Sequence, residues 1–215
     1  MSYPTLPPTP TPSVEQRVRP AVVRIRDLGC GVSVGTGVAL DDHHFATNAH
    51  VIEGPGTVQV NLWDGTLLHG NVDVASVRRD VAIVSVDGVL PTAPPAADQL
   101  ATVGTRVHIG GFPEAQPFEL TPGRVLGTRQ ILGFRSYTLD APIQPGDSGG
   151  PVLDEDGRVL GLVNIKNILE HRAYAIPIDD VIAVRDGTIP GQPLVGCGET
   201  EAALASDPSN REPQQ

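Results

Sequence analysis

The chain has 215 residues, and its 25 acidic side chains outnumber the 15 basic ones, giving a net charge of −10. No stretch gathers the basic and aromatic residues of a phosphate-tracking groove, which argues against nucleic acid as a partner. No apolar run approaches the roughly 20 residues of a membrane helix, and Met1 to Pro20 lacks the charged-then-apolar pattern of an export signal. We therefore expect no membrane insertion of this chain.

The composition favours an all-β fold. The 24 glycines and 21 prolines punctuate many short β-rich runs, and no long apolar helix pattern is present. A chain of this length can bury one sizeable core or two tightly packed halves.

Both ends differ from the middle. The segment YPTLPPTPTPSV, from Tyr3 to Val14, cannot continue a hydrogen-bonded ladder, so residues 1–17 are expected to be a flexible, extended leader. Few large apolar side chains follow Glu199, and residues 188–215 are expected to be mostly disordered.

Between the ends, β-rich runs fall into two groups of about six strands each. The first group comprises Ala21–Arg26, Gly31–Leu40, Thr57–Trp63, Leu67–Val77 and Val81–Asp87. The second comprises Arg106–Gly110, Phe118–Ile131, Ser136–Asp140, Pro151–Asp154, Arg158–Ile165 and Arg172–Ile178. The spacing of the apolar residues after them predicts a short helix over Ile178–Arg185. We therefore expect one unit over residues 18–187, with halves at 18–88 and 100–187 joined by the proline-containing linker 89–99.

Cys30 and Cys197 are the two cysteines of the chain and flank the strand-rich region. A disulfide between them would tie the C-terminal tail to the first half. The alternative is a pair of unrelated thiols in a reducing compartment. Neither a metal nor a cofactor is predicted, because no CxxC or neighbouring Cys/His pair occurs.

The segment Gly146-Asp147-Ser148-Gly149-Gly150-Pro151 contains the candidate nucleophile, Ser148. A serine hydroxyl needs a base within hydrogen-bond distance and donors for the oxyanion that forms when it adds to a carbonyl. The surrounding glycines free the backbone, so the amides of Gly146 and Ser148 can point at one spot. An ordinary glycine-rich turn is the structural alternative.

His50, in ATNAHVIEG, is the candidate base, and Asp80, in RRDVAIVSVD, is the candidate orienting carboxylate. The other five histidines suit surface or structural roles better. Asp80 precedes a continuous apolar strand, so its carboxylate would be buried and would need a partner such as the second ring nitrogen of His50. Asp73 is the fallback for the carboxylate. The histidine and aspartate lie in the first half and the serine in the second, so the site would form in the cleft between them.

GDSGG also matches G-x-S-x-G, the nucleophile elbow of α/β-hydrolases, which would indicate an esterase. In that fold the acid and the histidine follow the serine, and strands alternate with helices. Here the best histidine and aspartate precede Ser148, and His171 is the one histidine that follows it.

The segments FATNAHVIEG, RRDVAIVSVD and DAPIQPGDSGGPVLDEDGRVLGLV resemble the three signature blocks of the trypsin/chymotrypsin-like superfamily. The resemblance is closest to its HtrA (Deg)-like branch and to related actinobacterial periplasmic proteases, and extends from about Val18 to Ile182. It implies two packed six-stranded antiparallel β-barrels with a short C-terminal helix. It also implies peptide-bond hydrolysis by His50, Asp80 and Ser148, with an oxyanion hole at the amides of Gly146 and Ser148.

Two departures from the family pattern affect regulation. Asp147 stands where the HtrA branch usually has Asn, and no Ile-Val-Gly-Gly sequence occurs near Val22 to pair with that carboxylate after cleavage. The residues that follow Ile182 are too few for a PDZ domain, so regulation through such a domain is not expected.

The resemblance also assigns walls to the substrate pocket, from Ala141–Pro145 and Asn164–Asn167. The candidate substrate-binding residues are Ile143, Asn164, Ile165, Lys166 and Arg172. If Lys166 and Arg172 face the pocket, an acidic residue before the cut would be preferred. If they face solvent, a small apolar pocket near Ile143 and Ala175 remains.

The sequence thus predicts a serine endopeptidase that acts on protein or peptide substrates through an acyl-enzyme. A catalytically silent protease-fold binding module and an esterase are the alternatives. The chain would be extracytoplasmic, periplasmic or secreted, if it is processed from a longer precursor, and cytoplasmic if its N-terminus is native.

Overall fold

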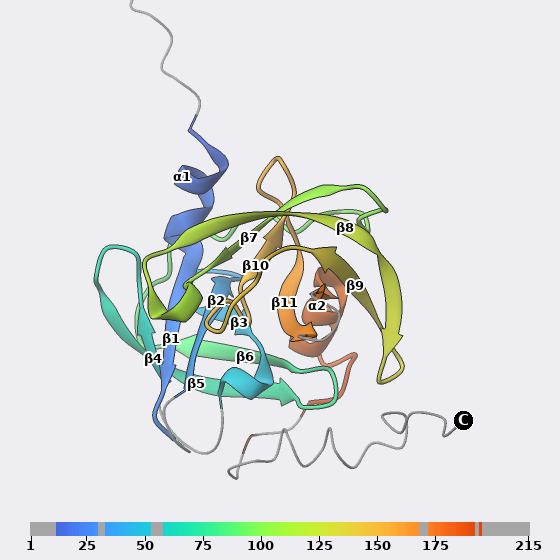
Figure 1. Ribbon diagram of the computed structural model, residues 1–215. Helices are drawn as coiled ribbons and strands as arrows, with labels where there is room; N and C mark the ends of the chain where they lie inside the picture. The colour runs from blue at the N-terminus through green and yellow to red at the C-terminus, as the bar shows by residue number, and fades with distance from the viewer. Residues whose placement is uncertain (1–11, 30–32, 53–57, 168–171, 192–193, 195–215) are drawn as a thin grey trace, which may run out of the picture.

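In a computed structural model, the strands of the protein close into two antiparallel barrels (Figure 1). The structure describes residues 12–29, 33–52, 58–167, 172–191 and 194, and for residues 165–167 it describes the backbone alone. The expected all-β class and the double barrel are confirmed.

Barrel one has the strand order β1-β2-β3-β6-β5-β4. Its strands are β1 (Val22–Asp27), β2 (Ser33–Ala39), β3 (His44–Thr47), β4 (Val58–Asn61), β5 (Leu67–Ser76) and β6 (Val81–Val86). All pairs along this barrel are antiparallel.

Barrel two repeats the same order, β7-β8-β9-β12-β11-β10 around the closed sheet. Its strands are β7 (Arg106–Gly111), β8 (Glu119–Ile131), β9 (Phe134–Asp140), β10 (Pro151–Leu153), β11 (Val159–Asn167) and β12 (Arg172–Pro177). Its pairs are antiparallel as well. Because an α/β-hydrolase requires parallel strands connected through helices, the fold excludes an esterase of that class.

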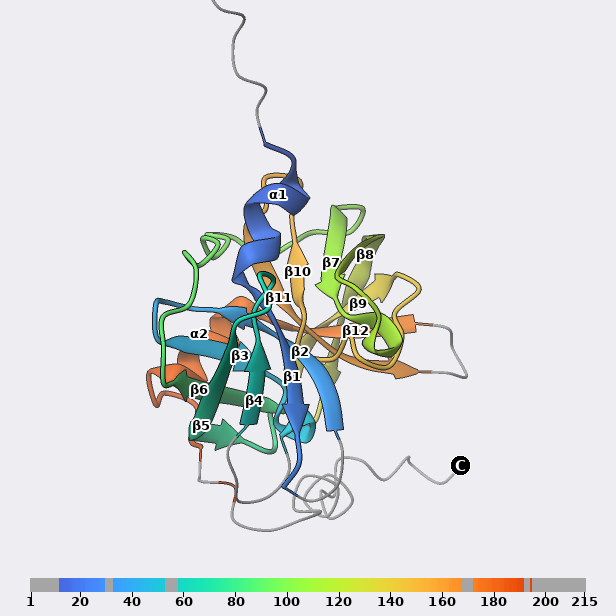
Figure 2. The ribbon, with the colours of Figure 1, turned by 90° about the vertical axis from the view of Figure 1, so that its left-hand side faces the viewer.

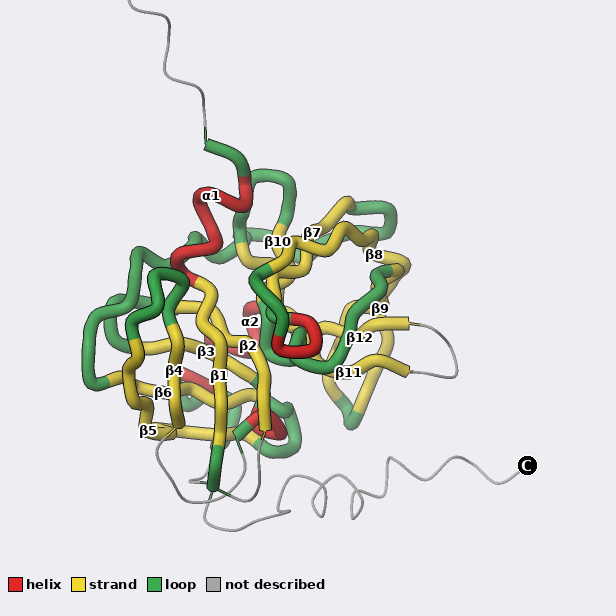
Figure 3. Tube along the Cα trace, turned by 60° about the vertical axis from the view of Figure 1, so that its left-hand side comes forward, coloured by secondary structure: helices red, strands yellow, loops and turns green. Residues whose placement is uncertain are grey.

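Two α-helices bracket the barrels. Helix α1 (Val14–Val18) leads through the 3-10 turn η1 (Arg19–Ala21) into β1, as Figure 2 shows. Helix α2 (Ile178–Arg185) follows β12, has the predicted bounds and contacts strands of both barrels. Figure 3 shows the barrels side by side with α2 between them. Two further 3-10 turns are η2 (Ala49–Val51) and η3 (Pro113–Ala115).

Strand alternation divides the apolar side chains among three clusters. On β1, Val23 and Ile25 point into the core of barrel one, whereas Val22 joins a second cluster between the barrels. That interface also contains Ile83 from barrel one and Leu162 from barrel two. A third cluster fills barrel two. The apolar side chains of the interface are therefore buried as fully as those of the barrel cores, and the halves form one unit.

Strand β3 is missing from the two predicted groups of runs, because it has four residues and follows a polar turn. Helix α1 lies inside the expected leader: Ser13 and Gln16 form a capping box that starts it. Cys30 and Cys197 lie outside the described residues. Among the described helices, none is long and apolar enough to cross a bilayer.

Candidate active site

His50 is held on the 3-10 turn η2, directly after β3. The turn projects the imidazole from the end of barrel one, and its side chain keeps 32% of its surface exposed. An imidazole in this position is accessible to a ligand while its backbone stays fixed.

Asp80 pairs with His50 through two hydrogen bonds. Its Oδ2 lies 2.7 Å from His50 Nδ1, and its Oδ1 accepts from the His50 main-chain N–H at 2.9 Å. The carboxylate side chain is 5% exposed. A buried carboxylate on Nδ1 makes this nitrogen the protonated one and leaves Nε2 as the acceptor.

The backbone of Asp80 adopts a left-handed conformation, with φ of 60°. Few residues other than glycine tolerate this region, although aspartate does so better than most. The buried Asn48 side chain donates from Nδ2 to the Asp80 carbonyl at 3.0 Å. Asn48 thereby fixes the peptide that aims the Asp80 carboxylate at His50.

The residues before Ser148 form a tight turn, Gln144-Pro145-Gly146-Asp147, closed by the Asp147 N–H donating to the Gln144 carbonyl at 3.1 Å. Proline at its second position and Gly146 at its third, with φ of 102°, are typical of a type II turn. The Pro145 carbonyl accepts from Glu114 N–H at 2.6 Å. Because the peptide is trans, the Gly146 N–H points away from Glu114.

The next amide that bears on the site belongs to Ser148. The Asp147 carbonyl accepts from the Gly150 N–H at 2.8 Å, which turns the Ser148 N–H the other way. Among the described residues, neither the Gly146 nor the Ser148 amide donates to a protein acceptor. Two unpaired donors two residues apart are what an oxyanion requires.

The Ser148 hydroxyl donates to the main-chain carbonyl of Asn164 on β11, at 3.3 Å. Asn164 is one of the predicted substrate-binding residues. The hydroxyl therefore rests against the strand that borders the predicted pocket.

Thr36 on β2 joins the serine loop to barrel one. Its main-chain N–H donates to the Ser148 carbonyl at 2.9 Å, and its hydroxyl donates to the Gly146 carbonyl at 2.7 Å. The same hydroxyl accepts from the Phe112 N–H at 3.3 Å. One buried threonine of barrel one thus binds the serine loop of barrel two at two carbonyls.

Close packing also brings the serine loop to the histidine turn. A Cβ on Gly149 would collide with the Thr36 carbonyl and the Thr47 hydroxyl, and would lie 3.1 Å from the Asn48 amide nitrogen. Thr47 and Asn48 immediately precede η2. Only glycine permits this approach, so His50 and Ser148 lie on two segments in direct contact.

Asp147 is 2% exposed, and its Oδ2 accepts from the Gln144 N–H at 2.8 Å. Burial raises the pKa of this carboxyl, the Gln144 hydrogen bond opposes the rise, and the nearby Glu119 charge adds to it. Among the described residues, no cation forms an ion pair with Asp147. The type II turn holds Gly146 without such a pair.

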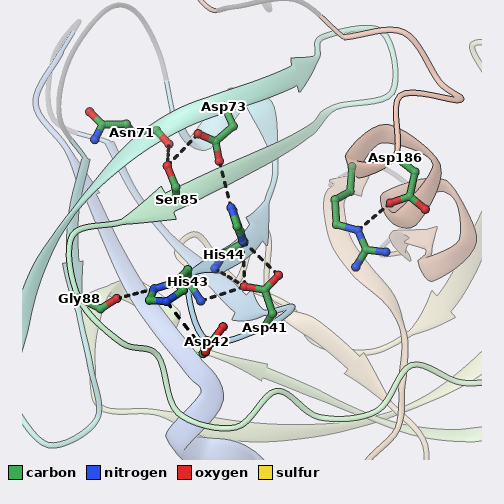
Figure 4. A network of polar contacts seen from close by, with 10 residues as sticks. Asp41, Asp42, His43, His44, Asn71, Asp73, Ser85, Gly88 and Asp186 are labelled. Atoms are coloured by element: carbon green, nitrogen blue, oxygen red, sulfur yellow. Dashed lines mark hydrogen bonds and ion pairs between the residues drawn. The ribbon is translucent and has the colours of Figure 1, made fainter.

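The fallback carboxylate, Asp73, belongs to a different network on barrel one (Figure 4). It accepts from the Ser85 hydroxyl at 2.8 Å and lies 3.7 Å from His44 Nε2, while His44 Nδ1 lies 2.8 Å from Asp41. Asp73 is therefore engaged with His44, and Asp80 is the carboxylate on His50. Across the described ranges, no three metal-binding side chains converge.

The predicted substrate-binding residues differ in their surroundings. Ile143 is 3% exposed within the cluster of barrel two. Ile165 and Lys166 lie on β11, where Lys166 pairs in register with Ala173. Arg172 begins β12 and is exposed at a pocket of about 330 Å³ that Leu126 and Thr138 also line.

Three residues that position the site were not singled out from the sequence: Thr36, Asn48 and Arg79. Arg79 is 3% exposed and reaches across the interface, with Nε donating to Asp180 of α2 and Nη2 donating to the Arg135 carbonyl. Burial lowers the pKa of this guanidinium, and the Asp180 charge opposes that shift. Its position next to Asp80 was the available signal.

Two six-stranded antiparallel barrels, with a histidine–aspartate pair held against a serine loop, define the class of chymotrypsin-like serine protease domains. The chain belongs to the trypsin-like peptidase domain family, whose model matches residues 35–162.

The relatives of this chain include serine proteases of bacteria. The probable periplasmic serine endoprotease DegP-like of Halomonas elongata is 33% identical over 165 residues, covering 72% of this chain and 35% of that protein. The serine protease Rv3671c of Mycobacterium tuberculosis is 35% identical over 158 residues, covering 67% of this chain and 40% of that protein. The chain therefore matches well under half the length of these two relatives.

A solved structure extends the likeness to nearly the whole chain. The crystal structure of the active form of the Rv3671c protease aligns with a TM-score of 0.78 at 27% identity, covering 92% of this chain and 98% of that one.

Proposed function

We propose that the protein is a serine endopeptidase that cleaves peptide bonds through an acyl-enzyme. The observation that carries the proposal is the buried Asp80 carboxylate, whose Oδ2 lies 2.7 Å from His50 Nδ1. The segment that bears His50 packs against the Ser148 loop. In this role Ser148 is the nucleophile, His50 is the general base and Asp80 is the orienting carboxylate.

The chemistry begins when Ser148 Oγ leaves the Asn164 carbonyl, 3.3 Å away, by rotation about its Cα–Cβ bond. It then gives its proton to His50 Nε2 and attacks the substrate carbonyl. Hydrogen bonds of this kind are often absent or long before substrate arrives and tighten in the complex. His50 afterwards protonates the leaving amine, and water repeats the cycle on the acyl group.

The amides of Gly146 and Ser148 would stabilise the oxyanion. The peptide before each amide fixes its direction. The Pro145 carbonyl accepts from the Glu114 N–H, and the Asp147 carbonyl accepts from the Gly150 N–H. Donors fixed before the reaction cost no reorganisation when charge develops. The oxyanion hole is therefore formed at rest, with Asp147 lacking an ion pair among the described residues.

The first experiment compares the wild type with Ser148→Ala on a fluorescently labelled unfolded protein substrate. Removal of the hydroxyl is expected to lower kcat/KM by about 10⁴-fold or more. Ser85→Ala, which removes a hydroxyl of the Asp73 network, is the matched control and should leave the rate unchanged. Equal activity of the wild type and Ser148→Ala would refute the assignment.

A catalytically silent binding module on the same fold is the competing function. A serine-directed fluorophosphonate separates the two, because it labels an activated serine and spares an inert one. Labelling should occur in the wild type and disappear in both Ser148→Ala and His50→Ala. A wild type that is neither labelled nor active would favour the binding module.

The pH profile provides a second readout of the base. An ordinary histidine has a pKa of about 6.5, and only its neutral form accepts the serine proton. The rate should therefore fall as the pH drops through this range. A rate that stays flat between about pH 8 and pH 5 would contradict His50 as the base.

The remaining predictions concern specificity and location. Lys166 and Arg172 favour an acidic residue before the cut if they face the pocket, whereas a small apolar pocket near Ile143 and Ala175 remains if they face solvent. A peptide library that selects Val, Ala or Leu before the cut would refute the acidic preference. By analogy with the periplasmic relative, we propose an extracytoplasmic location. Mass spectrometry of native protein with and without reductant tests the Cys30–Cys197 disulfide on which that proposal also relies.

A further inference from the structure

A groove of about 640 Å³ crosses the outer face of barrel one and borders the segment after β7. In Figure 2, strands β1, β4 and β5 of this face lie toward the viewer. The groove contains neither His50, Asp80 nor Ser148. It is large enough to hold several side chains of a bound polypeptide.

The basic character of the groove follows from strand alternation. Val23 and Ile25 of β1 point into the core, so Arg24 and Arg26 point outward. Arg19, from the turn before β1, adds a third guanidinium to the lining.

Among the residues that the structure describes, no acidic side chain lines this groove, although the chain has a net charge of −10. Within the described part of the chain, Arg19, Arg24 and Arg26 form no ion pair, whereas Arg79 and Arg106 each pair with an acid. Three guanidinium groups gathered without a counter-charge repel one another. An anionic ligand would remove that repulsion, so charge complementarity identifies an acidic occupant.

The other lining residues suit a polypeptide. Gln59 and Asn61 of β4 lie opposite Arg26 and Arg24 in register, and their amides can both donate to and accept from peptide groups. Trp63 is 51% exposed at the groove and offers a surface for apolar side chains.

A wall of the groove comes from barrel two, where Phe112 and Phe118 pack edge to face with centroids 5.7 Å apart. Nucleic acid fits less well, because the negative net charge opposes a long polyanion, and Trp63 is the one aromatic side chain more than half exposed among the described lining residues.

The groove begins beside the serine loop. Val34, which lines it, precedes Gly35, where a Cβ would lie 3.2 Å from the Ser148 carbonyl. On the opposite wall, the Phe112 carbonyl abuts Gly146 closely enough to exclude any side chain there. Phe112, which lines the groove, therefore places one end of the groove next to the turn that precedes Ser148.

We propose that this basic groove binds an acidic, extended stretch of a polypeptide substrate, adjacent to the bond that Ser148 attacks. That the occupant is a substrate rests on the proposed function, whereas binding of an acidic peptide does not. Arg24 and Arg26 provide the charge, and Trp63 provides the apolar contact.

Trp63 is the one tryptophan of the chain, so its fluorescence reports directly on the groove. The experiment uses full-length Ser148→Ala protein, which cannot cut the probe. The probe is a blocked hexapeptide of glutamates with one leucine and one phenylalanine, and its lysine counterpart is the control peptide. The expected result is a saturable change in emission with the acidic peptide alone, weakening steeply between about 0.02 M and 0.5 M salt.

Two variants test the charge. The double variant Arg24→Glu/Arg26→Glu should lower the affinity for the acidic peptide by at least about tenfold. The milder double variant Arg24→Gln/Arg26→Gln should lower this affinity less. Circular dichroism checks that both double variants are folded. Arg124→Glu on β8 is the control: it reverses one charge outside the groove and should leave the affinity unchanged.

Several results would overturn the proposal. One is the absence of a saturable change, and another is unchanged affinity in the double variants. Tighter binding of a single-stranded oligonucleotide of equal charge would identify a different occupant.

The chain's own tail is the remaining competitor. If replacing Glu199, Glu201, Asp207 and Glu212 with glutamine shifts Trp63 emission in unliganded protein, the tail occupies the groove and the proposal fails. Because the assay needs no hydrolysis, an inactive wild type would refute the proposed function and leave the binding result intact.

Discussion

The two barrels share one strand order but contribute differently to the site. In barrel one the connection from the third to the fourth strand bears His50, and in barrel two the same connection bears Ser148. Asp80 comes from the connection between the fifth and sixth strands of barrel one. Equivalent positions of one topology thus carry the histidine and the serine of the candidate site.

The means of holding these residues differs between the barrels. Barrel one fixes its pair with side chains, since the Asp80 carboxylate and the Asn48 amide bind backbone and ring atoms. Barrel two shapes its loop with main-chain turns and glycines, and depends on Thr36 of barrel one for two hydrogen bonds. The side chains that hold the His50–Asp80 pair thus come from barrel one itself, whereas the serine loop of barrel two also depends on barrel one.

The largest effect is expected from separating the barrels at Arg79. Arg79→Ala would leave Asp180 without its partner and the Arg135 carbonyl without its donor. Because Arg79 is buried and Asp180 is partly exposed, the loss should cost about 3 kcal/mol of unfolding free energy, at the low end for buried ion pairs, and urea denaturation measures it. Arg78→Ala, at the exposed neighbouring position, is the control and should cost about 1 kcal/mol. Similar losses at both positions would show that the barrels are not joined through Arg79.

Gly146→Ala tests whether barrel two relies on backbone shape. The new methyl would meet the Phe112 carbonyl at a φ of 102°, so the turn must shift and carry the Gly146 amide with it. Loss of one oxyanion donor lowers kcat by about 10²-fold or more. Gly104→Ala is the matched control, because it has a φ of 91° and open space around it. Full activity in Gly146→Ala would contradict an oxyanion role for this amide.

Thr36→Val tests the dependence of barrel two on barrel one. The substitution keeps the shape and removes the hydroxyl that joins the Gly146 carbonyl to the Phe112 amide. Two buried groups left without partners should cost about 1–3 kcal/mol. Activity should fall through kcat more than through KM. The comparison variant is Thr138→Val, at a buried threonine of β9. An equal loss of kcat in Thr138→Val would show that the effect is not specific to the contacts of Thr36.

The smallest effect concerns Asp147. Its raised pKa means that the folded state favours the protonated form, so its stabilising contribution is complete at low pH and is lost as the pH rises through the folded pKa. At neutral pH the ionised group is costly to bury. Asp147→Asn should therefore stabilise the fold by about 1 kcal/mol at pH 7 and by less near pH 4. Urea denaturation at both pH values measures this, and a larger gain at pH 4 would contradict it.

Most of the fold could be predicted because strand signals are local. Alternating apolar residues and turn-forming glycines located eleven of the strands, and the apolar spacing over Ile178–Arg185 located α2 with its observed bounds. Strand β3 was too short to stand out beside its polar turn. The prolines before helix α1 predicted an extended segment, although the capping box of Ser13 and Gln16 is a local signal for a helix start.

The site could be predicted where chemistry restricts residue type. A buried aspartate needs a partner, and the hydrogen bond to His50 is the one that the sequence predicted. Thr36 and Asn48 could not be singled out, because their contacts lie 110 and 32 residues away along the chain. A threonine gives no local sign of the carbonyl that it will meet. The catalytic roles themselves stay predictions.

The crossed placement of the two chain ends has a mechanical consequence. Helix α1 precedes barrel one, yet Arg17 donates to the Asp156 carbonyl of barrel two. Helix α2 ends barrel two, yet the residues after it pack on barrel one, with Gly191 against Val74 and Leu194 in the core. Force applied through helices α1 and α2 would therefore act on the interface between the barrels before it reaches either sheet, and His50 would separate from Ser148 while both barrels were still intact.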